Sequence, residues 1–356
     1  MNRAPPRAAS VAARVLRWHR QSGRRGLPWQ GVRDPYRVWL SEVMLQQTQV
    51  ATALAYYERF VRRFPDVAAL AAAPLDDVLA LWSGLGYYSR ARHLHRCAQV
   101  IVADHAGVFP RRSAELARLP GIGRSTAAAI AAFCFDERAA ILDGNVKRVL
   151  ARHAGFEADL ANAAAERELW AHAESLLPAA AQMARYTQGL MDLGALVCLP
   201  RQPRCEACPL AATCVARRSG RTAELPLKSR RLQRGERCNT LLWLRLRGEV
   251  LLVRRPERGV WAGLWSLPEF SDLDSASAVA ARWRGKRLAL PAIRHVLTHF
   301  DWHLQPLRCE LPPRLGSATR EAIASGLGGR WVGEADALQM SLPAPVRQLL
   351  SQALAT

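Results

Sequence analysis

Lysine, acidic residues and long apolar runs are all scarce in this sequence of 356 residues. Only Lys147, Lys228 and Lys286 are lysines, so few side-chain amines are available for covalent chemistry. No run approaches the ~20 consecutive apolar residues that span a bilayer, which argues against a membrane-spanning helix. Residues 1–7 contain no apolar core ahead of a cleavage site, so we do not expect a secretory signal. These absences predict a cytoplasmic protein without a membrane partner.

Positive charge is the most pronounced feature of the composition. The 50 basic and 30 acidic residues give a formal net charge of +20 and a pI near 10.9. A charge of this size favours a polyanionic partner, and nucleic acid is the first candidate. The alternative is a codon bias of a G+C-rich genome, because all but three of the basic residues are arginine. The choice of arginine over lysine therefore carries no functional information.

Apolar residues make up half of the chain, which is enough for two domains with separate cores. Apolar side chains recur every three or four positions in the first part of the chain, which predicts a mostly helical region. Its helices are expected at residues 66–81, 90–104, 113–118, 124–135, 145–154 and 163–177. Residues 217–237 hold eight Arg or Lys with little apolar periodicity and predict a solvated basic linker.

The pattern changes after this linker. Short apolar runs at 240–246 and 249–255 flank Arg247-Gly248 and predict a β-hairpin. Further strands are expected near 292–297 and 302–309, and helices near 275–284 and 344–353. The sequence therefore predicts a mostly α region at 1–216, the linker at 217–237, and an α+β domain at 238–356.

Four of the eight cysteines fall within seventeen residues, with the spacing Cys198-x6-Cys205-x2-Cys208-x5-Cys214. Four soft thiolates in one loop suit an iron–sulfur cluster or a tetrahedral zinc ion. Zinc ribbons usually pair two C-x-x-C motifs, and only one is present here, so the spacing favours a [4Fe–4S] cluster. Because no substrate-like residues gather in this loop, we expect a structural role.

The segment Leu119–Thr126 contains Gly121 and Gly123 directly before an alanine-rich helix. The glycines permit a tight turn in which backbone N–H groups can approach a phosphate, and the helix N-terminus adds positive potential. Such a turn would bind any duplex, because it carries no base-reading side chain. A plain joint between two helices is the alternative.

Two acidic residues, Glu42 and Asp143, interrupt otherwise apolar segments at 39–50 and 141–149, which we expect to be helical. Burial beside apolar side chains raises the pKa of a carboxyl group and favours its protonated form. From the pattern alone, Asp143 could be only a helix N-cap, and Glu42 could be an ordinary surface residue.

Six motifs together, spread over residues 15–225, resemble the adenine DNA glycosylases of the MutY family. They are Leu27-Pro28-Trp29, Ser41–Gln49, Gly84–Tyr88, the Leu119–Thr126 hairpin, Leu142–Val146 and the cysteine loop. The resemblance implies a helix-hairpin-helix base-excision repair enzyme with a [4Fe–4S] cluster, acting at the nucleoid. Its substrate would be double-stranded DNA in which adenine is mispaired with 8-oxoguanine or guanine. We expect a monomer that wraps the duplex.

The resemblance also implies roles for individual residues. Glu42 matches the general acid that protonates the adenine ring, and Asp143 matches the acid that stabilises the resulting sugar cation. Residues placed at the adenine pocket or at the base pair by the same resemblance are Arg25, Trp29, Leu45, Gln47 and Tyr87. The adenine must leave the base stack of the duplex to enter such a pocket, and this unstacking costs a few kcal/mol.

Ser125 departs from related helix-hairpin-helix enzymes that also cut the strand, such as endonuclease III, which place a nucleophilic lysine there. A Schiff base requires an amine, so Ser125 predicts a glycosylase without strand cleavage. Lys147 is the only lysine before residue 228 and lies one helical turn after Asp143. We expect it to contact the DNA and to trap the abasic product only slowly.

Residues 238–356 resemble a Nudix-type domain, most clearly at Gly259–Pro268. The acidic cluster that holds a divalent metal in working Nudix hydrolases is missing, so we expect binding of 8-oxoguanine rather than hydrolysis. Leu297-Thr298-His299 stands where family members often have Phe-Ser-His. Thr298 and His299 keep a hydroxyl and an imidazole, whereas Leu297 lacks the aromatic ring. An edge-strand hydroxyl and a surface histidine are the alternative.

Two other functions remain open on these residues. The first is a helix-hairpin-helix glycosylase for oxidised pyrimidines, which the missing hairpin lysine disfavours. The second is an iron–sulfur DNA-binding protein without catalytic activity, which the presence of both Glu42 and Asp143 in their motifs disfavours.

Overall fold

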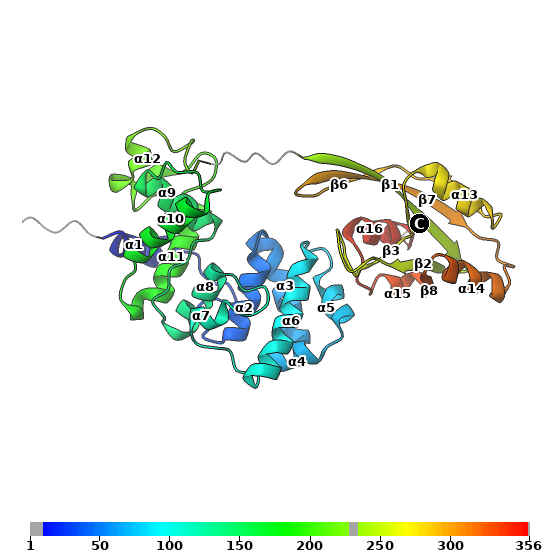
Figure 1. The fold of residues 1–356 in the computed structure, drawn as a ribbon, viewed down its shortest axis with the longest axis horizontal. Helices are drawn as coiled ribbons and strands as arrows, with labels where there is room; N and C mark the ends of the chain where they lie inside the picture. Colours follow the sequence, from blue (N-terminus) through cyan, green and yellow to red (C-terminus); the bar gives the residue numbers. More distant parts are fainter. Residues whose placement is uncertain (1–9, 228–233, 355–356) are drawn as a thin grey trace, which may run out of the picture. The chain divides into compact units, whose positions relative to one another are not determined.

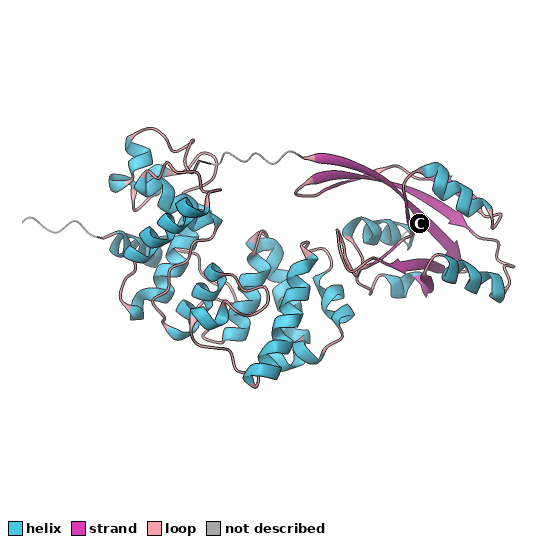
Figure 2. Cartoon of the chain, viewed as in Figure 1, coloured by secondary structure: helices cyan, strands magenta, loops and turns pink. Residues whose placement is uncertain are grey.

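The computed structural model describes residues 10–227 and 234–354, and their ribbon is drawn in Figure 1. The described residues fall into two compact units. The first unit takes its residues from Met1–Ala72 and His93–Arg231, and the second from Ala73–Arg92 and Leu232–Thr356. Figure 2 shows that strands occur in the second unit, whereas the first is built of helices.

The first unit is helical, as the spacing of apolar residues predicts. Its helices are α1 (Val11–Ser22), α2 (Pro35–Leu45), α3 (Val50–Arg63), α4 (Val67–Ala72), α7 (Ser113–Leu116), α8 (Arg124–Phe135), α9 (Gly144–Ala154), α10 (Ala163–Ser175), α11 (Met183–Leu196) and α12 (Val215–Arg218), with most of α6 (Tyr88–His105). Pro35 begins α2, and Asp34 caps it by accepting a hydrogen bond from the Tyr36 N–H.

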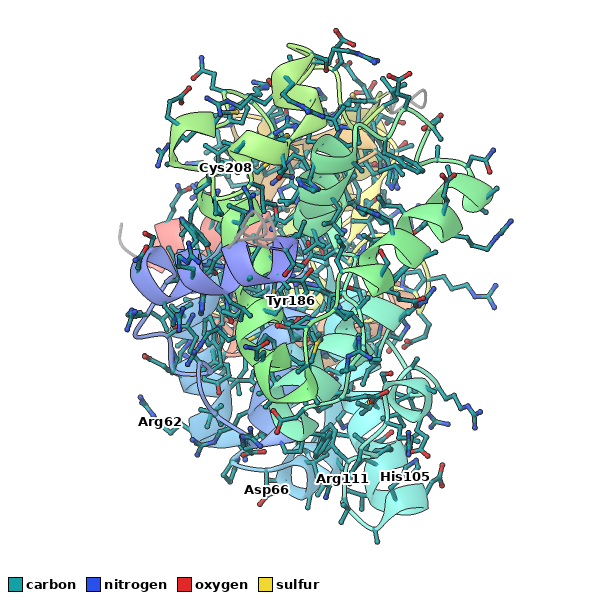
Figure 3. All side chains as sticks on the ribbon, turned by 90° about the vertical axis from the view of Figure 1, so that its left-hand side faces the viewer. Arg62, Asp66, His105, Arg111, Tyr186 and Cys208 are labelled. Carbon is teal, nitrogen blue, oxygen red and sulfur yellow. The ribbon has the colours of Figure 1, made fainter. Side chains whose placement is uncertain are left out.

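The core of the first unit joins α1, α8, α9, α10 and α11 through small and branched apolar side chains. Tyr186 of α11 lies inside this unit, whereas Arg62, Asp66, His105 and Arg111 lie at its outer edge (Figure 3). Alanines dominate the buried face of α8, so α2 and α11 can approach it closely. α2, which carries Glu42, therefore packs against α8, and the residue ahead of Asp143 contacts the same helix through the hydrogen bond from the Leu142 N–H to Ser125.

Two expected helices differ from the structure. The helix expected at 66–81 is two helices, α4 and α5 (Leu75–Trp82), because Pro74 disfavours a helical conformation of Ala73 and cannot donate a backbone hydrogen bond. The segment 39–50 is likewise not one helix. Helix α2 ends at Leu45, and Gln47 takes a left-handed conformation with φ 58° before α3 begins at Val50.

The second unit contains a mixed sheet in the order β3-β2-β1-β7-β5, with β4 on β1, β6 on β7 and β8 on β2. Its elements are β1 (Gly235–Leu246), β2 (Glu249–Arg254), β3 (Trp265–Ser266), β4 (Glu269–Phe270), α13 (Leu273–Ala281), β5 (Lys286–Ala289), β6 (Ile293–Val296), β7 (Phe300–Glu310), α14 (Ser317–Gly326), β8 (Gly329–Gly333), α15 (Glu334–Ala337) and α16 (Ala344–Leu354). The β1–β7 pair is parallel and the others are antiparallel. The expected hairpin and α+β class are confirmed.

Residues 73–92 group with the second unit although they lie early in the chain. Ser83 Oγ donates to the Leu342 carbonyl at 2.7 Å, and Arg254 pairs with Asp76 at 2.9 Å. These contacts join α5 and the following loop to residues near the C-terminus.

The stretch expected as a solvated linker is in part packed against the first unit. Leu225 is 2% exposed, and its carbonyl accepts a hydrogen bond from Arg152 Nε at 2.9 Å. Gly235, at the other end of the expected linker, begins β1. Residues 228–233 of this linker, and the N-terminal residues considered for a secretory signal, lie outside the described residues. No helix within 10–227 or 234–354 has the length and apolar character to cross a bilayer.

Candidate active site and cysteine loop

Glu42 lies on α2 at a cleft of the first unit with a volume of about 780 Å³. The cleft is lined by His19, Arg20, Arg24, Arg25, Gly26, Trp29, Gln30, Gly31, Val32, Arg33, Val38, Ser41, Glu42, Phe133, Ala184, Arg185 and Gln188. Its apolar wall and its arginines come from α1, α2, α8, α11 and the loop after α1. The volume is within the range of small-molecule sites, which is about 300–1,000 Å³.

The environment of Glu42 favours its protonated form. Desolvation by burial, followed by the negative charge of Asp143, raises the pKa of Glu42 to about 8. Val43 and Met44 beside it are buried, so α2 gives the carboxyl group an apolar setting. Glu42 is thus a half-buried acid at a cleft rather than a surface residue, and it retains its proton at neutral pH.

Asp143 caps the N-terminus of α9. Its Oδ1 accepts hydrogen bonds from the N–H groups of Asn145 at 2.6 Å and Val146 at 3.1 Å. Both bonds use Oδ1, which leaves Oδ2 free of these capping contacts. The expected N-cap is therefore present, and the negative charge of Asp143 also contributes to the raised pKa of Glu42. Asp143 is not among the residues that line the cleft.

The hairpin of residues 119–123 leads into α8 with different roles for its two glycines. Gly121 has φ 76°, and a Cβ atom there would lie 2.6 Å from the Cβ of His93, so the turn itself requires glycine. Gly123 is the N-cap of α8 with φ −82°, and a Cβ there would meet no atom within 4 Å. Open space therefore lies beside Gly123, where α8 begins.

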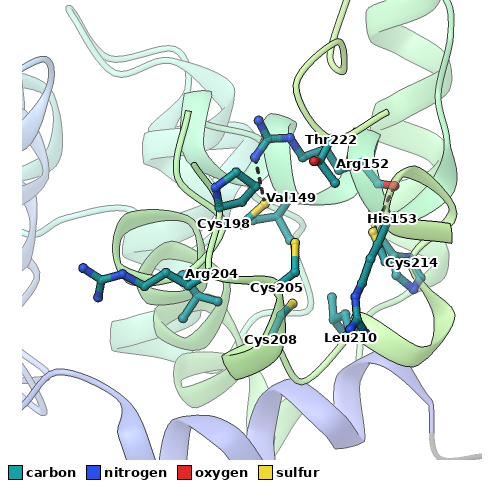
Figure 4. Close-up of a pocket in the computed structure, with 14 residues that line it drawn as sticks. Val149, Arg152, His153, Cys198, Arg204, Cys205, Cys208, Leu210, Cys214 and Thr222 are labelled. Atoms are coloured by element: carbon teal, nitrogen blue, oxygen red, sulfur yellow. Dashed lines mark hydrogen bonds between the residues drawn. The ribbon is translucent and has the colours of Figure 1, made fainter. Parts of the chain in front are cut away.

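The four clustered cysteines line one pocket, drawn in Figure 4. All four are free thiols, and Cys198 and Cys208 pack against the core. Burial raises the pKa of Cys208 to about 11, so in the absence of a metal this group is a neutral thiol. Within residues 10–227 and 234–354, no three His, Cys, Asp or Glu side chains are arranged to hold a single metal ion.

Two arginines of α9 attach the cysteine loop to the helix that Asp143 caps. Arg148 donates to the Cys198 carbonyl at 2.7 Å and to Asn145 Oδ1 at 2.9 Å. Arg152 is 3% exposed and donates to the Leu199 carbonyl at 2.6 Å, and its Nη1 lies 3.4 Å from Cys198 Sγ (Figure 4). The cysteine loop is therefore continuous with α9 through hydrogen bonds.

Comparison with known proteins identifies the family. Residues 40–175 match the HhH-GPD superfamily of base excision DNA repair proteins, and residues 240–352 match the NUDIX domain. An adenine DNA glycosylase of Buchnera aphidicola subsp. Acyrthosiphon pisum is 34% identical over 343 residues, which cover 94% of this chain and 95% of that protein. The chain belongs to the adenine DNA glycosylase family.

A second curated relative agrees with this assignment, and a solved structure is similar in fold. The adenine DNA glycosylase of Mus musculus is 35% identical over an alignment that covers 80% of this chain and 67% of the mouse protein. The structure of a thermostable thymine-DNA glycosylase superposes with a TM-score of 0.53 at 28% identity, covering 58% of this chain and 95% of that one. The predicted family and fold class are confirmed.

In this member of the adenine DNA glycosylase family, Arg25 and Trp29 line the same cleft as Glu42. Trp29 is 8% exposed and packs edge-on against Tyr57, with ring centroids 5.0 Å apart. Leu45 ends α2 half-buried, and Gln47 is exposed in the turn that follows. The structure thus groups Arg25 and Trp29 with the acid.

Tyr87 and Thr298 meet in the second unit, where their hydroxyl oxygens lie 3.0 Å apart. Tyr87 is 44% exposed and has φ 50°, a strained conformation for an aromatic residue. Thr298 and His299 are exposed at the turn between β6 and β7. This contact could not be anticipated, because the two residues are 211 positions apart.

Ser125 and Lys147, both expected at the DNA, have protein partners. Ser125 Oγ accepts a hydrogen bond from the Leu142 N–H at 3.0 Å. Lys147 Nζ forms an ion pair with Glu166 Oε1 of α10 at 2.5 Å.

Sequence reasoning missed Asp192, which does not line the cleft but is hydrogen-bonded to Arg24 and Gln188, which do. It is fully buried and accepts hydrogen bonds from the Arg24 backbone N–H at 2.8 Å and from Gln188 Nε2 at 2.9 Å. Burial opposes ionisation of Asp192, but the nearby His19 imidazole and the hydrogen bonds and charge of Arg24 outweigh it and lower its pKa. The signal for Asp192 in the sequence was a lone acid in the otherwise apolar segment Met191–Leu196. Sequence reasoning also missed Arg148 and Arg152, which bind the cysteine loop, and their spacing of one helical turn was the available signal.

Proposed function

We propose that the chain removes adenine that is mispaired with 8-oxoguanine or guanine in double-stranded DNA, by hydrolysing its N-glycosidic bond. The observation that carries this proposal is the place of Glu42 at a cleft, where burial and the charge of Asp143 raise its pKa to about 8. A carboxylic acid with a raised pKa and a second carboxyl group are the two groups that most glycoside hydrolases use.

Glu42 serves as the general acid. Adenine leaves poorly as an anion, so protonation at its N7 makes it a neutral leaving group. A proton on Glu42 at neutral pH is available for this transfer because burial keeps the carboxyl group from ionising. The proton moves from the Glu42 carboxyl group to the base as the bond between N9 and C1′ breaks.

Asp143 stabilises the positive charge that develops on the sugar. Loss of adenine leaves an oxocarbenium-like cation, which a carboxylate stabilises before water attacks. The Asn145 and Val146 N–H groups hold Oδ1, so the orientation of the carboxylate is fixed while Oδ2 remains free to face the sugar. Preorganised charge of this kind needs no rearrangement during the reaction.

The adenine must leave the duplex to reach Glu42, and the cleft of about 780 Å³ has room for a nucleoside. The hairpin can hold the DNA backbone, because the space in front of Gly123 admits a phosphate to the N-terminus of α8. The net charge of +20 supplies the long-range attraction. Leu45, Gln47 and Tyr87 are proposed to fill the gap at the base pair.

The second unit is proposed to bind the base opposite adenine through Thr298 and His299, which are exposed at one turn. Its acids have structural partners instead of a metal-binding arrangement: Glu269 pairs with Arg237 and Arg255, and Asp272 caps α13. These contacts support binding rather than hydrolysis. Leu297 offers no aromatic ring, so discrimination against guanine depends on the hydroxyl and imidazole groups.

A [4Fe–4S] cluster held by Cys198, Cys205, Cys208 and Cys214 is the proposed cofactor. The fit is supported by the pocket that all four thiols share and by Arg152, whose Nη1 faces Cys198 Sγ and suits a thiolate. When bound, the cluster supplies structural bracing of the loop. None of these cysteines lines the Glu42 cleft, which supports a role outside the chemical step.

A single-turnover assay tests the function. The substrate is a duplex with one adenine opposite 8-oxoguanine, and alkali-labile sites report base loss. We expect Glu42→Gln to abolish them while the duplex is still bound, because glutamine keeps the shape of the side chain but has no acidic proton. Adenine release by Glu42→Gln at the wild-type rate would overturn the assignment. A wild-type chain that binds the duplex and releases no base would favour a non-catalytic DNA-binding protein.

A further inference from the structure

Ser125 connects the hairpin helix to the segment that carries Asp143. Its Oγ lies 3.0 Å from the backbone nitrogen of Leu142 and accepts the hydrogen bond of that N–H group. Ser125 is in the first turn of α8, whereas Leu142 is the residue before Asp143 at the start of α9. The contact therefore holds the Ile141–Leu142 peptide, which lies one residue ahead of the proposed catalytic carboxylate.

The surroundings of Leu142 make this bond consequential. Ile141 and Leu142 are each 3% exposed, so the Leu142 N–H is remote from bulk water. A buried N–H group without an acceptor is unfavourable, and a chain that loses its acceptor tends to shift until the group is satisfied. Any such shift would move Asp143, since the two residues share a peptide bond.

We propose that Ser125 is a positioning residue for Asp143. Its hydroxyl anchors the Ile141–Leu142 peptide, one residue ahead of Asp143, while the N–H groups of Asn145 and Val146 hold the Asp143 carboxylate. The backbone and the side chain of Asp143 are thereby constrained independently. This inference rests on the proposed function, because it assigns Ser125 a part in adenine excision rather than in contact with DNA.

Thr126 makes a comparable contact to the segment that carries the other acid. Its Oγ1 lies 3.4 Å from Nε2 of Gln46, the C-cap of α2. Consecutive hydroxyl groups of α8 thus reach the two segments that hold Glu42 and Asp143. The N-terminal turn of α8, which follows the DNA-binding hairpin, is therefore the common support of both acids.

The test compares Ser125→Ala, which removes the acceptor, with Ser125→Thr, which retains a hydroxyl at the same place. Ser113→Ala is the matched control, because Ser113 Oγ also makes one side-chain hydrogen bond, to Glu137 Oε1 at 2.9 Å, away from Asp143. Single-turnover excision is measured at saturating enzyme, and affinity is measured with a duplex that has no mispair. The full chain is used throughout, and thermal unfolding shows that each variant is folded.

We expect Ser125→Ala to slow excision about tenfold, the size of effect of one buried hydrogen bond, with unchanged affinity for the duplex. Ser125→Thr should recover most of the rate, and Ser113→Ala should excise at the wild-type rate. The pH above which activity falls should also decrease in Ser125→Ala, because a displaced Asp143 raises the pKa of Glu42 less. A role in stability alone would leave this pH dependence unchanged.

Two results would overturn the proposal. The first is excision by folded Ser125→Ala at the wild-type rate. The second is a loss of affinity for the duplex with a normal rate at saturation, which would assign Ser125 to the DNA contact instead. Failure of the wild-type chain to excise adenine is a different result, since it refutes the proposed function itself.

Discussion

Asp143 raises the pKa of Glu42, although Asp143 begins α9 and Glu42 lies near the end of α2. A nearby negative charge disfavours the ionised form of a buried carboxyl group, so the charge of Asp143 helps Glu42 to retain its proton. Two segments that are far apart in the sequence thus act together on the protonation of the proposed acid.

The raised pKa of Glu42 predicts an effect on stability. A carboxyl group whose folded pKa lies above its unfolded value holds its proton more tightly in the folded state, so the folded state loses stability as the pH rises from about 4.5 to about 8. We expect Glu42→Gln to unfold at a higher temperature than wild type at pH 8 and at a similar temperature at pH 4. Glutamine has the same shape, so it removes only the titration. Equal unfolding temperatures at pH 8 would contradict the raised pKa.

The same shift predicts the pH dependence of catalysis. The rate of adenine release in single turnovers should be constant near neutrality and fall above pH 8, as Glu42 loses its proton. His19 and the arginines Arg20, Arg24, Arg25, Arg33 and Arg185 also line the cleft. Arginine remains charged over this range, so a loss of rate centred near pH 8 is attributed to Glu42. A rate that rises through pH 8 is incompatible with Glu42 as the acid.

The double role of Asp143 can be separated by two substitutions. Asp143→Asn keeps a side-chain oxygen for the Asn145 and Val146 N–H groups, whereas Asp143→Ala removes the cap. We expect both to abolish adenine excision, but only Asp143→Ala to lose about 1 kcal/mol of unfolding free energy. Denaturant titration measures the difference. Substantial excision by Asp143→Asn would show that the negative charge is not needed.

The cysteine loop predicts a spectroscopic result. Protein purified without oxygen should be brown with a broad visible absorption, and Cys208→Ser should lose this absorption. Cys238→Ser is the control, because Cys238 is exposed in β1 of the second unit and outside the loop. A colourless wild-type protein that contains one zinc ion per chain would show that the cysteine loop binds zinc instead of an iron–sulfur cluster.

Lys147 predicts the behaviour of the abasic product. Its ammonium group is paired with Glu166 at 2.5 Å and must lose a proton before it can form a Schiff base. We expect borohydride to trap a small amount of protein on DNA after excision, and Lys147→Ala to abolish the crosslink without stopping excision. Lys286→Ala, in β5 of the second unit, serves as a comparison. Crosslinking that persists undiminished in Lys147→Ala would exclude this lysine.

The sequence alone determined the residue types of the site. Glu42, Asp143 and the four clustered cysteines belong to contiguous motifs, so their spacing is visible without coordinates. The helical spacing before residue 217 and the hairpin at 240–255 were likewise local patterns, which is why the fold class could be predicted. Caps follow from adjacent residues, and the N-cap role of Asp143 was foreseen as one of two alternatives.

Only the tertiary structure decided which residues act on one another. The pKa of Glu42 depends on burial by neighbouring helices, and the Ser125–Leu142 bond joins residues seventeen positions apart. The grouping of residues 73–92 with the second unit depends on contacts with residues beyond position 250, such as Arg254 and Leu342. Desolvation and hydrogen bonding depend on three-dimensional proximity, and the spacing of residues along a chain does not specify it.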